Sequence, residues 1–149
     1  MSATSPSWSI AATLAVIGDR WTLLILREIF RGHHRFSEIQ SELGVARNLL
    51  SERLGQLVDA EVLERVPYQE RPLRNEYRLT PKGADLSASL IALMKWGDRW
   101  YADDEPPTVL VHSHCGTPVD LHVSCRACNT IVPPGQVRNQ TDTPKAEAR

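Results

Sequence analysis

The 149-residue chain lacks the defining features of several protein classes. It has no run of 18 apolar residues, so no segment predicts a membrane-spanning helix or a membrane partner. Residues 1–7 carry no basic stretch and no long apolar core, so we expect no secretory signal and a cytoplasmic location. There are only three cysteines, and stabilising disulfides are not expected in a reducing cytoplasm. With 42% apolar residues, the chain can form one compact domain with a small appendage.

An excess of positive charge is also missing. The formal net charge is −1, whereas domains that bind nucleic acids are usually basic. Between Arg27 and Arg78, the arginines are matched one for one by acidic residues. Composition alone therefore does not predict DNA binding, and any phosphate contact has to come from the local arrangement of a few side chains.

The central part of the chain predicts a winged helix-turn-helix. Residues 36–43 and 47–60 each carry apolar residues at helical spacing, and Gly44 separates the two patterns. Two short amphipathic helices joined through a glycine are typical of a helix-turn-helix. Residues 62–68 and 76–80 then alternate around a polar, proline-containing loop, which predicts a β-hairpin with a wing at its tip.

Three further helices are expected around this unit. The first ends before Gly18, and Asp19 is a suitable N-cap for a second, strongly apolar helix that should be the buried spine of the domain. Thr80 should cap a last helix, with Pro81 in its first turn, that runs to about Tyr101.

The first and last helices carry more apolar surface than one small domain can cover. Such surplus patches normally mark interfaces, so we predict that these helices pair across a two-fold axis. The alternative is that both helices complete the core of a monomer. The predicted interface residues are Trp8, Ile10, Leu14, Leu90, Leu93, Met94 and Trp100.

Five blocks of sequence carry a family resemblance. Residues 18–28, 35–39, 50–54, 79–83 and 96–97 resemble, in order, the blocks of the HxlR family of bacterial winged-helix transcriptional regulators. The resemblance covers about residues 8–101. It implies a cytoplasmic homodimer that binds palindromic operator DNA and answers to oxidants, reactive aldehydes or other small ligands. Many relatives open the first helix with a redox-sensing cysteine, but Ser9 stands here and cannot form a thiolate.

The residues predicted to contact DNA lie in three places. A recognition helix meets base edges with its N-terminal residues. Arg47 can offer a fork to guanine, Asn48 a donor and acceptor to adenine, and Ser51 suits phosphate or either base. Ser37 could cap the preceding helix and offer its amide to phosphate. The alternative for each is a solvated side chain or a local ion pair, as between Arg53 and Glu52. The full set is Ser37, Arg47, Asn48, Ser51, Arg53, and in the wing Arg71 and Arg74.

The composition changes after Tyr101. We divide the chain into a winged domain (8–102), an acidic, proline-containing linker (103–107), a Cys/His-rich segment (108–132) with short strands at 109–111 and 119–123, and a disordered tail (133–149). The overall class is thus α+β, mainly α: a winged helix-turn-helix with flanking dimerisation helices and a small β-rich appendage.

The Cys/His-rich segment holds two similar turns that predict a structural zinc site. Each has ligand-type residues three positions apart and ends in a residue that tolerates positive φ, Gly116 or Asn129. Brought together as a small zinc ribbon, they would give a closed site of three sulfurs and one nitrogen. His114 competes as the histidine ligand. The other interpretations are a Cys125/Cys128 dithiol that senses redox state, or inert packed cysteines. The predicted ligands are His112, Cys115, Cys125 and Cys128.

Two classes of function follow from these patterns. The first is a homodimeric transcriptional regulator that binds double-stranded operator DNA and responds to an unidentified small-molecule or stress signal. The second is a winged-helix module for protein contacts without DNA binding. An enzyme is not expected, because a fully ligated zinc site leaves no open coordination position.

Overall fold

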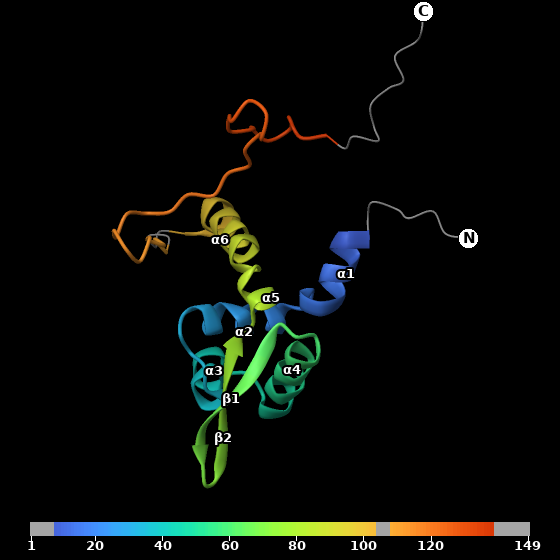
Figure 1. The fold of residues 1–149 in the computed structure, drawn as a ribbon, viewed down its shortest axis with the longest axis vertical. Helices are drawn as coiled ribbons and strands as arrows, with labels where there is room; N and C mark the ends of the chain where they lie inside the picture. Colours follow the sequence, from blue (N-terminus) through green and yellow to red (C-terminus); the bar gives the residue numbers. More distant parts are fainter. Residues whose placement is uncertain (1–7, 104–107, 139–149) are drawn as a thin grey trace, which may run out of the picture. The chain divides into compact units, whose positions relative to one another are not determined.

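The computed structural model describes residues 8–103 and 108–138, except for the side chain of Trp8. It divides into one unit up to Trp96 and a second from Gly97. The elements, in chain order, are α1 (Trp8–Ile17), α2 (Arg20–Phe30), α3 (Phe36–Leu43), α4 (Arg47–Asp59), β1 (Leu63–Glu70), β2 (Leu73–Leu79), α5 (Pro81–Ala84) and α6 (Ser87–Tyr101) (Figure 1).

The first unit is built around α2, as its apolar pattern predicts. This helix contacts α3, α4 and β2 and buries Ile25, Leu26 and Ile29 completely or nearly so. The buried hydrophobic residues form one core: Ile17, Ile25, Leu26, Ile29, Ile39, Val45, Leu50, Leu54, Leu57, Val62 and Leu63. Burial on this scale is the main source of stability for such a domain.

Both predicted caps of the flanking helices are present. The Asp19 carboxylate accepts hydrogen bonds from the backbone amides of Trp21 and Thr22 at 3.0 and 3.1 Å, at the start of α2. The Thr80 hydroxyl accepts one from the amide of Gly83 at 3.1 Å, with Pro81 in the first position of α5. Gly83 is needed here because any Cβ would collide with the carbonyl oxygen of Val62.

The helix-turn-helix consists of α3, the turn at residues 44–46 and α4, as predicted. Gly44 ends α3 in the left-handed conformation, with φ of +60°, which a glycine adopts without strain. On α4, Leu50, Leu54 and Leu57 face the core. This spacing fixes the rotation of α4 about its own axis and leaves its other face exposed.

The wing differs from the prediction in its length. We expected a loop over residues 69–75, but β1 and β2 pair up to Glu70 and Leu73, so that only Arg71 and Pro72 form the turn (Figure 1). The register shifts by one residue between Pro67 and Gln69. Pro67 and the bulge lie in β1, an edge strand, which tolerates both where a central strand would not.

The single helix predicted from Pro81 to Tyr101 is also wrong: it is divided into α5 and α6. The chain turns at residues 85–86, where the amide of Leu86 bonds the carbonyl of Gly83 at 3.1 Å instead of continuing the α-helical ladder. Leu86 and Leu90 then pack against the core. Turning the chain after α5 lets these two leucines reach the core, and this packing outweighs the continuous helical pattern.

The second unit contains little regular structure after α6. The strands predicted at 109–111 and 119–123 are reduced to isolated bridges, Val111 with Pro118 and Ser124 with Ile131. Arms of two or three residues are too short to form a stable sheet. Residues 133–138 form no helix or strand, and the rest of the predicted tail and residues 104–107 of the linker lie outside the described residues.

No single helix in the described part of the chain is long and apolar enough to cross a membrane. Residues 9–17 and 20–30 reach the length and hydropathy of a membrane span only when taken together, and this pair is bent by 78°.

Candidate nucleic-acid interface

The N-terminal turn of α4 presents an exposed polar surface. Arg47, Asn48 and Ser51 are all exposed, while Leu50 between them is fully buried. The first turn of α4 contains no acidic residue. The guanidinium carbon of Arg47 lies 5.3 Å from the centroid of the Phe36 ring, a cation–π contact that joins the starts of α3 and α4. This end of α4 is therefore cationic and accessible, and its backbone amides add positive potential.

Arg53 lies one turn further along and is occupied within the protein. Its Nε atom is 3.3 Å from Oδ1 of Asp19, and its Nη1 atom donates a hydrogen bond of 2.8 Å to Gln56. Burial raises the pKa of Asp19. Hydrogen bonds from Thr22 and Trp21 and the charge of Arg53 lower it by more, so the pKa lies below its ordinary value. Asp19 therefore stays ionised and ties α4 to the start of α2.

The start of α3 is capped differently from the expectation. Ser37 was expected to cap this helix, but Arg35 occupies the N-cap position and Ser37 lies inside the first turn, where it is exposed. The capping group is the Glu38 carboxylate, which accepts hydrogen bonds from the backbone amides of His34 and Arg35 at 3.1 and 3.0 Å. Glu38 at the third helical position is the residue that a capping box uses, and this signal was present in the sequence.

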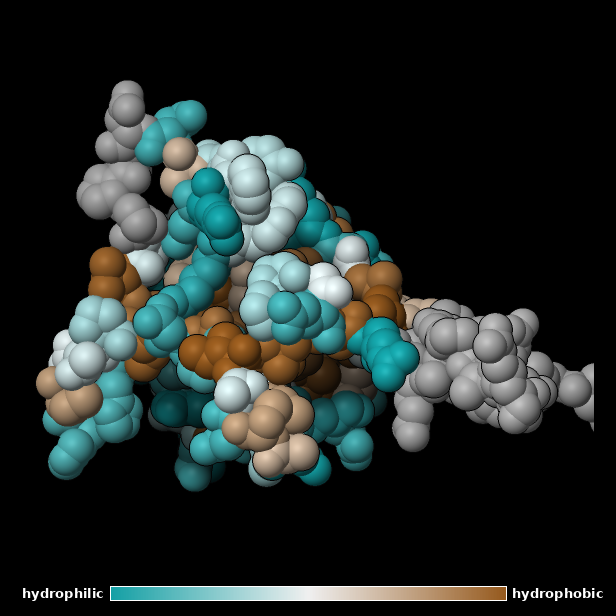
Figure 2. Space-filling model, turned by 90° about the horizontal axis from the view of Figure 1, so that it is seen from above, coloured by the Kyte–Doolittle hydropathy of each residue, from teal (hydrophilic) through white to brown (hydrophobic). Residues whose placement is uncertain are grey.

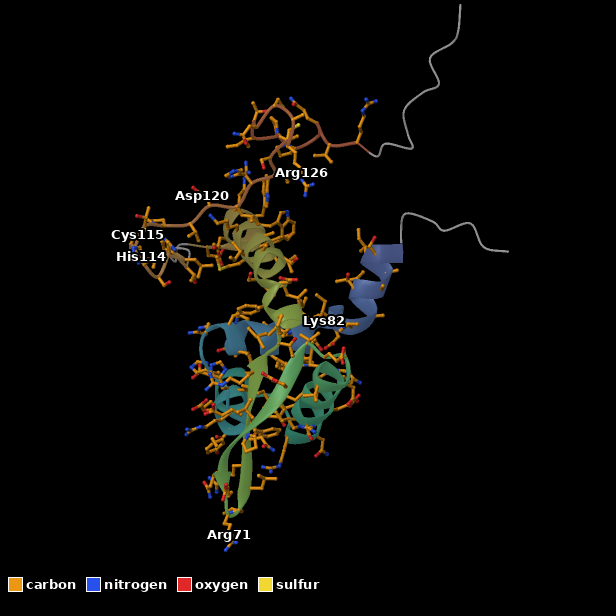
Figure 3. All side chains as sticks on the ribbon, in the orientation of Figure 1. Arg71, Lys82, His114, Cys115, Asp120 and Arg126 are labelled. Atoms are coloured by element: carbon orange, nitrogen blue, oxygen red, sulfur yellow. The ribbon has the colours of Figure 1, made fainter. Side chains whose placement is uncertain are left out.

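Arginines mark the wing. Arg71 lies in the turn itself, at the tip of the hairpin (Figure 3), and Arg74 is exposed on β2 opposite Gln69. Arg78 is also exposed but forms an ion pair of 2.6 Å with Glu76. Hydrogen bonds from Arg78 and Arg35 and their charges hold the pKa of Glu76 below its ordinary value, against a smaller opposing effect of burial. Arg71 and Arg74 therefore differ from Arg78, whose charge is already paired.

Arg35 connects the helix-turn-helix to the wing, a role that the sequence analysis missed. Its Nε atom is 3.3 Å from Oε1 of Glu76, and its guanidinium carbon is 4.4 Å from the centroid of the Tyr68 ring. The amide of Tyr77 also donates a hydrogen bond of 2.8 Å to the carbonyl of His34. These contacts join segments about 40 residues apart, for which no local pattern gives a signal.

A buried ion-pair network at the end of α2 was also missed. The side chain of Glu28 is completely buried, and its oxygens lie 2.7 Å from Arg27, 3.2 Å from Arg31 and 2.9 Å from His33. Burial raises the pKa of Glu28, but hydrogen bonds from His33 and Arg27 and the charges of the two arginines lower it more. The available signal was that position 28 falls in the buried stripe of α2. Glu42 completes a group of possible metal ligands with Glu28 and His33, but the carboxylate of Glu28 already has three partners.

The predicted dimer residues lie on exposed or half-buried helix surfaces. In α1, Ile10 and Leu14 are 70% and 57% exposed. No residue of α6 is buried; Leu93 and Trp100 are exposed, while Leu90 and Met94 are half-buried. Figure 2, which looks onto the molecule from above the view of Figure 1, shows apolar side chains at the surface. The side chain of Trp8 lies outside the described residues.

The predicted zinc ligands form two pairs. His112 and Cys115 lie in one turn, and Cys125 and Cys128 in the other; in the described part of the chain the two pairs do not form one group of four. Hydrogen bonds from the hydroxyl and amide of Thr117 lower the pKa of the Cys115 thiol. Hydrogen bonds from the backbone amides of Cys128 and Ala127 and from the Cys128 side chain lower the pKa of Cys125. His114 and Cys115 are labelled in Figure 3.

Comparison with known proteins identifies the family. Residues 16–105 match the HxlR-like helix-turn-helix family. The chain belongs to this family. An HxlR-type protein of this kind is a DNA-binding transcriptional regulator, and the relatives are named as regulators rather than as enzymes. The helix-turn-helix formed by α3 and α4 lies within the matched residues.

Individual relatives extend the likeness beyond the winged domain. An uncharacterized HTH-type transcriptional regulator of Mycobacterium tuberculosis is 43% identical over 137 residues, which cover 91% of this chain and 85% of that protein. The crystal structure of PA1607, a proposed transcription factor, is 38% identical and matches with a TM-score of 0.80 over 95% of this chain and 97% of its own. The reduced form of the transcriptional regulator YodB from Bacillus subtilis is 29% identical, with a TM-score of 0.55 over 69% and 100%.

The family match and the mycobacterial alignment cover different lengths of the chain. The family match ends at residue 105. The mycobacterial alignment covers 91% of the chain, which is possible only if it includes residues 108–132. The Cys/His-rich segment is therefore an addition to the HxlR domain that this relative's alignment also spans.

Proposed function

We propose that this HxlR-type regulator binds two-fold symmetric operator DNA as a homodimer, with α4 of each protomer in a major groove. The observation that carries the proposal is the exposed polar start of α4, where Arg47, Asn48 and Ser51 surround the buried Leu50. A helix anchored by its apolar face presents its polar face rigidly, as direct base readout requires. Arg47 would then read guanine and Asn48 adenine.

The remaining contacts would position the protein on the phosphate backbone. Arg71 and Arg74 in the wing are exposed, and no ion pair is recorded for them among the described residues. The amide of Ser37, in the first turn of α3, can donate to a phosphate. We leave Arg53 out of the direct base contacts, because Asp19 and Gln56 engage it. Such local charges make phosphate binding compatible with a net charge of −1.

The dimer would form through α1 and α6. Both helices expose large apolar side chains in the single chain, including Leu14 and Leu93, at 57% and 53%. A patch of this kind on a regulator of small size is best explained by a second copy of the chain, because one winged domain alone makes too few base contacts for specific affinity. Two-fold pairing then predicts half-sites about 34 Å, or one helical turn, apart.

We further infer a cytoplasmic location and control by a small-molecule or stress signal, the effector itself being unidentified. The thiol chemistry that uses a cysteine at the start of the first helix is not available, because Ser9 occupies this position. All three cysteines of the chain lie after residue 114. Any redox response would have to originate in the Cys/His-rich segment.

A gel-shift assay tests this function. Full-length protein is mixed with duplex fragments from the upstream region of its own gene at two salt concentrations. We expect retention of a fragment with inverted half-sites, and weaker binding at the higher salt concentration because counterions are released on binding. Inserting five base pairs between the half-sites, about half a helical turn, should abolish specific retention. Equal affinity for all fragments, or none at low salt, would contradict the proposal and favour a module for protein contacts.

A further inference from the structure

The two turns of the Cys/His-rich segment are one motif repeated. At a constant offset of 13 residues, Cys115 corresponds to Cys128, Gly116 to Asn129 and Thr117 to Thr130. His112 corresponds to Cys125 in this alignment, whereas His114 corresponds to Ala127. We call the two repeats knuckle 1 (residues 110–119) and knuckle 2 (residues 123–132). The repeat places one ligand-type residue at each of the same two positions in both knuckles.

The backbone of the two knuckles repeats in the same way. In knuckle 1 the amide of Gly116 bonds the carbonyl of His112 at 2.7 Å, and in knuckle 2 the amide of Asn129 bonds that of Cys125 at 2.9 Å. The bonds that close each turn, to Thr117 and Thr130, measure 2.8 and 2.9 Å.

The last residue of each turn has the conformation that the sequence predicts. Gly116 and Asn129 have φ of +70° and +52°. Asn129 is one of only two non-glycine residues in the described chain with positive φ. The left-handed conformation at equivalent places shows that both turns have the same backbone geometry.

The side chains of each knuckle converge as metal ligands do. In knuckle 1, Nδ1 of His112 lies 3.3 Å from Sγ of Cys115. Two ligands on one tetrahedral zinc, at about 2.0 Å for nitrogen and about 2.3 Å for sulfur, are separated by about 3.6 Å. In knuckle 2, the amides of Ala127 and Cys128 donate to the sulfur of Cys125.

In each knuckle a threonine hydroxyl contacts the sulfur of the second cysteine position, Cys115 or Cys128. The hydroxyl of Thr130 lies 3.1 Å from the sulfur of Cys128, and that of Thr117 bonds Cys115. Each knuckle thus surrounds its sulfur atoms with polar groups that suit a thiolate.

Burial of apolar surface does not hold this segment together. None of the residues described between 108 and 138 is buried, and Val109, Val123 and Ile131 are each more than half exposed. A segment of this size without a core normally depends on a metal or a covalent link. The repeated turn geometry therefore needs a source of stability other than packing.

We propose that one Zn²⁺ joins the two knuckles of a single chain through His112, Cys115, Cys125 and Cys128. The sulfur-rich ligand set suits zinc, and four protein ligands leave no open position, so the site is structural. The pairs stand apart in the structure, and residues 120–122 between them belong to no helix or strand. Coordination of one ion by both pairs requires a change of backbone direction at these residues. The three thiols lose their protons to solvent on coordination.

Metal binding by the full-length, reduced protein tests this site. Apo protein is titrated with Co²⁺ and then with Zn²⁺. We expect one Co²⁺ per chain, with the intense visible bands of a tetrahedral site and a sulfur-to-cobalt band, and displacement by one Zn²⁺. Cys115→Ser and Cys128→Ser, which affect different knuckles, should each weaken zinc binding about a hundredfold or more. His112→Ala should do the same, whereas the matched control His114→Ala should not.

Other results would overturn the proposal. Protein without tetrahedral cobalt bands and with freely reactive thiols has no such site, and a reversible Cys125–Cys128 disulfide would then favour the dithiol sensor. Binding of one metal per two chains, or restored binding on mixing Cys115→Ser with Cys128→Ser protein, would assign the site to two chains. The site is independent of the proposed DNA binding. A failed metal titration with intact operator retention would leave that function standing, and the reverse result would do so for the zinc site.

Discussion

The winged domain and the Cys/His-rich segment show two ways in which a short sequence can hold a defined backbone. The domain buries a continuous core in which Ile25, Leu50 and Leu54 are completely inaccessible. The described residues of the segment after residue 107 include no buried side chain, and its order comes from two hydrogen-bonded turns. Packing therefore fixes the position of α4, whereas local turn chemistry fixes the knuckles. The two regions should respond to different perturbations.

The largest contrast is expected from truncating apolar side chains in each region. Ile25→Ala should destabilise the winged domain by about 2–5 kcal/mol, because it removes a fully buried side chain and leaves a cavity. Val123→Ala, at a site that is 60% exposed, should change the free energy of unfolding by less than about 0.5 kcal/mol. Urea unfolding followed by tryptophan fluorescence measures the winged domain, and amide hydrogen exchange of residues 108–132 under the same conditions measures the segment. Equal losses would mean that the segment has a packed core after all.

The next effect concerns assembly through α6. Leu93→Glu should weaken the dimer by about 3 kcal/mol, or about a hundredfold, because a charge would have to be buried against the partner. Ala88→Glu places the same charge at an exposed position about 140° around the helix from Leu93 and is the matched control. Analytical ultracentrifugation at micromolar concentration should show monomers only for Leu93→Glu. A wild-type protein that is itself monomeric would refute the assignment of this face.

The buried ion pairs of Glu28 predict a pH dependence that belongs to the winged domain alone. The folded state lowers the pKa of Glu28, so its ionised form stabilises the fold above its ordinary value of 4.5, and this contribution is lost as pH falls through the lower folded value. Glu28→Gln should therefore cost about 1–3 kcal/mol at pH 7, and the difference from wild type should shrink below pH 4.5.

Urea titrations of both proteins at pH 7 and pH 3 measure this difference. The exposed Asp59, changed to Asn, serves as control. A difference between wild type and Glu28→Gln that stays constant down to pH 3 would show that ionisation of Glu28 contributes nothing.

Much of the winged domain could be predicted from the sequence, because its signals are local. The caps Asp19 and Thr80 and the break between helices at Gly44 depend on neighbouring backbone groups and were expected at these positions. The break after α5 and the pairing of Arg35 with Glu76 were missed, because both depend on contacts with distant residues. The wing loop was predicted too long, since the exposed strands of the hairpin contain the same polar residues as a loop.

The Cys/His-rich segment shows the opposite balance. The positive φ of Gly116 and Asn129 followed from residue type, and the structure has both. The short strands did not form, because pairing between arms is a non-local property that the alternation of apolar residues does not guarantee. The proposed joining of the two knuckles would depend on the binding energy of zinc, which the conformational preferences of the residues do not contain.

The central claim is that the winged domain reads DNA through the start of α4, and three arginine-to-alanine variants test it most directly. Binding to the retained upstream fragment and to a scrambled duplex is measured at several salt concentrations. Arg47→Ala should cost about 1–3 kcal/mol on the specific fragment and relax its preference. Arg74→Ala should weaken both duplexes alike and flatten the salt slope by about one. Arg126→Ala, in knuckle 2, should change neither. Unchanged operator affinity in Arg47→Ala, or a loss of it in Arg126→Ala, would contradict the account.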